Sequence, residues 1–288
     1  MCIRDSFIPD PSRVIARFLY TNDERSEKII RSVLAMSDEE TKTTISQVLR
    51  GFSKRHRNIS RIFEKHFNKL SHLFDRMGID QNQVNQHQKV LIGSYFTMEY
   101  SIESAAFFNP SIVEDPDQSE LLQGEKRVIL SFRATGEGHI SSIVFRSAVL
   151  DKNCNMIVEP VGSMLAEAER IERHVYNKNS FILTLDGMSD FDNRVSPMFV
   201  FDKLGDKFTY GELLRAVKET KRTHQLSSEK ESIINQIMWL ALSHYEIDFS
   251  LDSAISERVI FPISDTERNG IEDARFVRFI EDNGEVTY

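Results

Sequence analysis

The spacing of apolar residues changes near residue 90, and this change constrains the fold more than any other feature. Before it, apolar side chains recur every three or four residues, which is typical of amphipathic helices. The clearest stripe covers residues 59–77 and consists of Ile59, Ile62, Phe63, Phe67, Leu70, Leu73, Phe74 and Met77. After residue 90, short apolar runs with partial alternation favour strands. The sequence therefore predicts an α+β chain with an N-terminal helical region over 1–90 and a strand-rich region over 91–288.

Local signals give expected helix boundaries in the first region. Asp10 followed by Pro11 predicts the start of a first helix, and the spacing of Ser37 and Glu40 matches a capping box. Gly78 is expected to end a helix of about 20 residues that carries the stripe. Residues 1–6 differ in character from the rest of the chain and are expected to be a non-native scar that resembles a translated sequencing adapter. The helices are also a candidate surface for forming a homo-oligomer.

The face opposite the apolar stripe is basic. Its members are Lys54, Arg55, Arg57, Arg61, Lys65 and Lys69. Such a face fits either a site for an anionic partner or the solvated side of a docking helix. The histidines share no metal-ligand spacing, so we expect no metal site.

The second region reads as strands interrupted by helices. Residues 127–133 and 140–150 form a candidate hairpin around a turn at Gly136 and Gly138, and residues 157–158 can add a strand. Helical spacing returns over 162–176, after a Thr209–Glu212 capping pattern, and from Ser228. We therefore expect a helical insertion over about 162–246, which either builds a pocket beside the β scaffold or braces it.

Composition and charge narrow the classes of function. The net charge of −8 disfavours a general nucleic-acid binder. The two cysteines cannot build a disulfide framework, no apolar run reaches the length of a membrane span, and no signal core follows the N-terminus. These features favour a cytoplasmic protein with no membrane or nucleic-acid partner and no bound cofactor.

Polar groups gather where strands are expected to begin or end. Glu272, Asp273 and Arg275 follow an Asn-Gly turn and precede an apolar run that suggests a strand from Phe276. Other groups in such positions are Glu103, Asn109, Arg133 and Arg146. Together they suit a polyhydroxylated ligand, because carboxylates accept from sugar hydroxyls and arginines donate to them. Asp273 is placed to protonate a glycosidic oxygen. Composition and spacing alone favour the other interpretation, in which Glu272, Asp273 and Arg275 form a structural ion pair at the start of a strand.

Three short motifs resemble a known family. They are Phe-Asn-Pro-Ser-Ile-Val at 108–113, Ser-Phe-Arg-Ala-Thr-Gly at 131–136 and Gly-Ile-Glu-Asp-Ala-Arg at 270–275. They are similar to motifs of glycoside hydrolase family 130, which comprises β-mannoside phosphorylases and β-mannosidases. Alanine stands at 274, where the family usually has proline. The resemblance implies a five-bladed β-propeller, of which 91–288 would cover about two blades, with Asp273 as proton donor. Asn109 and Arg133 would bind the sugar and Arg275 would support them.

The resemblance also implies an inverting mechanism. In the phosphorylases inorganic phosphate attacks the anomeric carbon and yields mannose 1-phosphate, whereas in the hydrolases a carboxylate base activates water. We expect a phosphorylase acting on β-mannosides, with a β-mannosidase or a non-catalytic carbohydrate-binding propeller as alternatives. Two blades would leave an open sheet edge and half a cavity wall, so the chain by itself is expected to be inactive and prone to associate.

Overall fold

The computed structural model describes residues 7–162, 164–170, 175–188, 195–223, 227–243, 245–264, 267 and 269–288. The expected scar at residues 1–6 lies outside them. The chain divides into two compact units. Unit 1 comprises Met1–Glu167, Ser250–Phe261 and Gly270–Tyr288, and unit 2 comprises Ala168–Phe249 and Pro262–Asn269. Unit 2 has one hydrophobic core, whereas unit 1 has two, one among its helices and one on its sheet.

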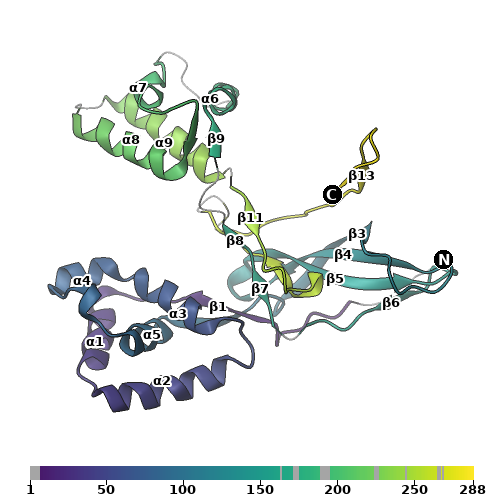
Figure 1. Cartoon of the computed structure of the whole chain (residues 1–288), viewed down its shortest axis with the longest axis horizontal. Helices are drawn as coiled ribbons and strands as arrows, with labels where there is room; N and C mark the ends of the chain where they lie inside the picture. The colour runs from purple at the N-terminus through teal and green to yellow at the C-terminus, as the bar shows by residue number, and fades with distance from the viewer. Residues whose placement is uncertain are drawn as a thin grey trace. The chain divides into compact units, whose positions relative to one another are not determined.

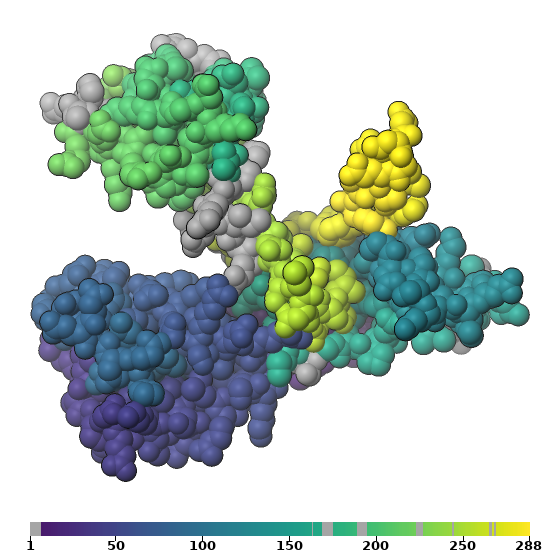
Figure 2. All heavy atoms as spheres, in the orientation of Figure 1, coloured from purple at the N-terminus to yellow at the C-terminus, as the bar shows by residue number. Residues whose placement is uncertain are grey.

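The N-terminal part of unit 1 contains a group of helices around one apolar core (Figure 1). The helices are α1 (Asp23–Leu34), α2 (Asp38–Phe52), α3 (Ile59–Asn68), α4 (Ser71–Met77) and α5 (Gln86–Tyr95). Their apolar faces supply the core, as the three-to-four-residue spacing predicts. In Figure 2 the heavy atoms of this group form the closely packed purple and blue part of the surface.

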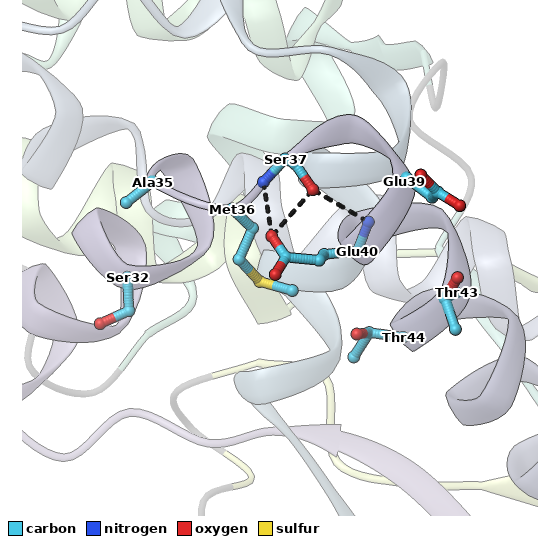
Figure 3. A pocket seen from close by; sticks show the side chains of 8 residues that line it. All are labelled: Ser32, Ala35, Met36, Ser37, Glu39, Glu40, Thr43 and Thr44. Atoms are coloured by element: carbon cyan, nitrogen blue, oxygen red, sulfur yellow. Dashed lines mark hydrogen bonds between the residues drawn. The ribbon is translucent and has the colours of Figure 1, made fainter.

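The expected helix ends are partly confirmed. The Ser37–Glu40 capping box forms at the start of α2, with reciprocal bonds drawn in Figure 3. Gly78 ends α4 with a left-handed φ of 66°. The prediction of one continuous helix is wrong, because the chain breaks at Leu70 between α3 and α4. The break lets the rings of Phe67 and Phe74 meet edge to face, with centroids 5.2 Å apart in the core.

The helix expected after Asp10 is also wrong. The Asp10 carboxylate accepts from the Ser12 N–H in a turn, and residues Val14–Phe18 then form strand β1. This strand pairs antiparallel with β2 (Thr97–Ser101), far along the sequence. Successive side chains of β1 point to opposite sides, so Ile15 packs into the core of the sheet and Ala16 into the core of the helices. Long-range pairing therefore overrides the local helix signal.

His66 on α3 is a buried polar residue at the edge of the helical core. Its Nδ1 lies 2.6 Å from Thr97 Oγ1, and the Thr97 hydroxyl donates to the Gly93 carbonyl. The hydroxyl therefore accepts from a neutral imidazole that carries its proton on Nδ1. Burial, with further contributions from Lys69 and Lys65, lowers the pKa of His66 to about 4.

This lowered pKa predicts acid sensitivity. Because the folded pKa lies below the unfolded value, the stabilising term is present above about pH 6.5 and is lost as pH falls toward about 4. We expect the free energy of unfolding to fall by about 2 kcal/mol between about pH 7 and pH 5, measured by urea titration. His66→Gln keeps an amide donor for Thr97 and should remove this part of the slope. An unchanged slope in that variant would contradict the prediction.

The sheet of unit 1 has the order β3-β4-β5-β12-β7, with β6 pairing the other half of β5. Its strands are β3 (Ala106–Glu114), β4 (Lys126–Thr135), β5 (Ser141–Leu150), β6 (Met156–Val158), β7 (Ala166–Glu167) and β12 (Arg258–Ile260). The predicted β4–β5 hairpin and the extra strand at β6 are confirmed. Within the described residues no sheet closes on itself, and the class is mixed α and β.

The two faces of this sheet differ in chemistry. On β4, Val128, Leu130, Phe132 and Ala134 point into the hydrophobic core. Ser131, Arg133 and Thr135 alternate with them and therefore lie on the opposite face. On β5, Arg146 alternates together with the core residues Val144 and Ala148. Arg133 and Arg146 thus belong to different faces.

Unit 2 is mainly helical, with its own core (Figure 1). Its elements are β8 (Glu169–Arg170), β9 (Val175–Asn177), α6 (Lys178–Asp186), α7 (Met198–Phe201), β10 (Lys207–Thr209), α8 (Tyr210–Thr223), α9 (Ser228–Ser243) and β11 (Ile247–Asp248). The Thr209–Glu212 cap and the start of α9 at Ser228 are confirmed. The helix expected over 162–176 is wrong, because its described residues form short strands, of which β7 pairs with β12. Residues 163 and 171–174 lie outside the described part.

The chain ends with a short hairpin of β13 (Phe279–Ile280) and β14 (Val286–Thr287). The strand expected from Phe276 therefore starts three residues later, because residues 271–278 join no strand in the described part of the chain. Among the described helices, none has the length and apolar character needed to cross a membrane.

Candidate functional site

Residues 270–276 form a segment that docks onto the face of the sheet that carries Ser131, Arg133 and Thr135. Gly270 makes a parallel bridge with Ser141, and the Ile271 N–H donates to the Ser141 carbonyl at 3.0 Å. Farther along, the Phe276 ring packs on Phe145 with centroids 5.5 Å apart. These anchors hold the intervening residues, Glu272 and Asp273, beside the end of β4.

Four of the predicted site residues meet at this segment. The Asn109 side-chain amide donates to Oδ1 of Asp273. The Arg133 guanidinium donates to Glu272 at 2.7 Å, and its Nη1 lies 3.9 Å from the same Oδ1 of Asp273. Arg133 Nε also donates to Ser141 Oγ at 2.9 Å. No sequence signal marked Ser141 or Phe145, because an anchoring serine or phenylalanine on a strand looks like any other strand residue.

The backbone at both ends of the Asn109–Asp273 contact is unusual. Asn109 has a φ of 48° and lies in a β-bulge between Phe108 and Ser111, and Asp273 has a φ of 44°. Left-handed backbone is uncommon for residues other than glycine, although Asn and Asp tolerate it best. Such strained positions cluster at functional sites, and bulges re-aim side chains there. The bulge turns the Asn109 amide toward Asp273.

The site is open to solvent on its acidic side. The Arg133 side chain is 24% exposed, whereas those of Glu272 and Asp273 are 67% and 54% exposed. Phe108 lies opposite Arg133 in the register of β3 and β4 and is 47% exposed on the same face. An incoming polar ligand can therefore reach both carboxylates, with an aromatic ring beside them.

Glu103 and Arg146 lie elsewhere, although the sequence grouped them with the site. Glu103 is fully buried and accepts from Arg146 at 2.7 Å, and its other oxygen lies 2.9 Å from Arg13 Nε. The Asp10 N–H also donates to Glu103. These groups face the core side of the sheet, so their position argues against sugar contact and for a structural ion cluster. Sequence reasoning had no signal for Arg13, which comes from a distant segment.

Burial lowers the pKa of Arg13 to about 10, and the neighbouring Arg146 guanidinium contributes in the same direction, while Glu103 opposes it. Arg13 also donates to the Ser256 carbonyl at 2.7 Å. The buried Glu103 carboxylate therefore holds Arg146 and the segment that carries Asp10 and Arg13, and Arg13 in turn bonds to Ser256.

Arg275, the remaining predicted site residue, is exposed and makes no ion pair with any residue that the structure describes. The basic face near α3 is largely engaged by its own chain. Arg55 donates to Glu99, Arg57 to Asp252 and Glu257, and Lys69 lies over the Phe18 ring. These contacts favour the docking interpretation over an anionic partner.

A shallow hollow near the start of α2, seen in Figure 3, offers no comparable chemistry. It is lined by Ser32, Ala35, Met36, Ser37, Glu39, Glu40, Thr43 and Thr44. Ser37 and Glu40 already bond to each other in the capping box, and no predicted site residue lines the hollow. The Asn109–Asp273 cluster therefore remains the stronger candidate.

The Gly270 position yields a prediction. Its φ is 111°, and a Cβ there would lie 2.5 Å from the Ser141 backbone nitrogen. Gly270→Ala should therefore lift the segment off the sheet, and we expect hydrogen exchange of the Ile271 amide to speed up about tenfold or more. Gly284→Ala is the matched control, because its φ is 85° but nothing lies within 4 Å of the added Cβ. Equal Ile271 protection in both variants would refute the docking role.

Comparison of the chain with protein-family models gives no match, and none is found among curated proteins or solved structures.

Proposed function

We propose that this protein is an inverting phosphorylase of β-mannosides, built on a five-bladed propeller, with Asp273 as the proton donor. One observation carries the proposal. The side chains of Asn109, Arg133 and Asp273, drawn from two strands and a segment up to 164 residues away, meet on one face of the sheet. Because the same three motifs resemble those of glycoside hydrolase family 130, we assign the reaction of that family to this cluster.

The proposed reaction is balanced by one proton transfer. A phosphate oxygen attacks the anomeric carbon of the mannosyl group while the bond to the leaving oxygen breaks. Asp273 supplies the proton that this oxygen needs, by way of a mannosyl hydroxyl, which avoids expelling a strongly basic alkoxide. The products are mannose 1-phosphate with inverted configuration and the shortened acceptor. Arg133 and the exposed Arg275 supply donors for sugar hydroxyls.

The test uses the complete gene product with β-mannobiose, with and without inorganic phosphate. Phosphorus NMR should show mannose 1-phosphate forming only when phosphate is present. Cleavage at the same rate with and without phosphate would contradict the proposal and support the β-mannosidase alternative. Binding without cleavage would indicate a carbohydrate-binding propeller. Neither cleavage nor binding across a panel of β-mannosides would remove the whole assignment.

A further inference from the structure

The contact between Asn109 and Asp273 suggests a role for Asn109 that differs from sugar binding. We infer that Asn109 is a positioning residue: its amide holds Oδ1 of Asp273, so that the catalytic proton resides on Oδ2. The inference rests on the proposed function and assigns the oxygen that delivers the proton.

The chemistry of the two side chains fixes the direction of the bond. A carboxylate accepts through both oxygens, so only the NH₂ end of the Asn109 amide can face Oδ1. Arg133 Nη1 lies 3.9 Å from the same oxygen, which is an ion-pair distance and too long for a hydrogen bond. In a protonated carboxyl group the carbonyl oxygen is the better acceptor and the hydroxyl is the donor. The Asn109 donor at Oδ1, with the Arg133 charge on the same side, therefore favours the proton on Oδ2.

The backbone explains why asparagine suits this position. Residue 109 has left-handed backbone within the bulge, and asparagine tolerates this conformation while supplying an amide donor. Aspartate tolerates the same backbone but lacks a donor, and glycine tolerates it without a side chain. Both substitutions therefore remove the donor without adding backbone strain.

Turnover separates positioning from sugar binding. Misplacing a reacting group by about 1 Å costs about 100-fold in rate, so Asn109→Gly and Asn109→Asp should lower kcat about 100-fold. The KM and the dissociation constant for mannose should change less than about twofold, because the amide does not contact the sugar. Weaker mannose binding with unchanged kcat would instead make Asn109 a sugar ligand and overturn the inference.

Asn58→Gly provides the matched control. Asn58 has a φ of 49°, nearly that of Asn109, and its side chain makes no capping bond at the start of α3. This variant should keep the parental kcat. If it loses as much kcat as Asn109→Gly, the effect reflects the backbone at left-handed positions, and the inference fails.

A measurement without turnover separates this inference from the proposed function. The side-chain amide signals of Asn109, assigned by NMR from the Asn109→Asp spectrum, should shift in Asp273→Gly, because glycine keeps the left-handed backbone and removes the acceptor. If the Asn109 amide signals do not shift in Asp273→Gly, the positioning contact is overturned, whether or not the protein cleaves β-mannosides. A parent protein that cleaves no β-mannoside would overturn the proposed function and leave the amide shift to test the contact itself.

Discussion

Asp273→Asn in the complete gene product is expected to lower kcat about 1000-fold while leaving β-mannoside binding nearly unchanged. General acid catalysis contributes about 100- to 10,000-fold, and an amide cannot deliver the proton. Asparagine also tolerates the φ of 44° at this position, and its carbonyl can still accept from Asn109. The variant therefore removes the acid and preserves the geometry. Steady-state kinetics of mannose 1-phosphate release, with calorimetry for binding, measure the two effects.

The neighbouring carboxylate provides the comparison. Glu272→Gln removes the charge that pairs with Arg133 but keeps a group that can accept from it, so we expect a loss of only about tenfold in kcat. The contrast between adjacent carboxylates distinguishes an acid from an electrostatic support. Turnover by Asp273→Asn at the parental rate would exclude Asp273 as the proton donor, and an equal loss in both variants would leave it without a distinct role.

Glu103→Ala is expected to lower the free energy of unfolding by about 3–5 kcal/mol, the largest stability effect we predict. It would leave the guanidinium groups of Arg13 and Arg146 buried without their shared counter-charge, and breaking a buried pair from one side carries a cost of this size. Urea unfolding followed by circular dichroism measures the change. Poor folding of the alanine variant would agree in direction, and the milder Glu103→Gln keeps the effect quantifiable.

Glu114→Gln is the control for Glu103, because Glu114 forms an ion pair with Lys126 on the same sheet. The atoms are 3.3 Å apart, but the two side chains are 37% and 67% exposed. Exposed pairs contribute about 0–1 kcal/mol, so we expect a small change. If the two glutamine variants lower the free energy of unfolding equally, the cluster around Glu103 stabilises the protein no more than an exposed ion pair does.

Features decided by neighbouring residues could be predicted from the sequence. The capping box at Ser37, the cap at Thr209 and the β4–β5 hairpin each depend on a few residues close in the chain, and each is present. Features decided by distant partners could not. Strand β1 exists because Thr97–Ser101 pairs with it, and Arg13 is charged and buried because Glu103 lies beside it.

The same distinction applies to the candidate site: local motifs indicated its residues, whereas distant partners decide its geometry. The motifs indicated Asn109, Arg133 and Asp273 as a group, and the structure brings these side chains together. No motif could indicate on which face of the sheet each side chain lies. Arg133 and Arg146 look equivalent as strand arginines, yet their positions on β4 and β5 send them to opposite sides. The hydrogen bond between Asn109 and Asp273 also depends on a β-bulge that no local sequence pattern predicts.

The interruption of unit 1 by unit 2 has a consequence for biosynthesis. Strand β12 pairs with both β5 and β7, yet all of residues 168–249 are translated before it. At a ribosomal rate of about 5–20 residues per second, half of β5 keeps a bare edge for several seconds while the helical unit emerges. During that interval the unpaired edge of the nascent sheet is exposed to mispairing with other strands.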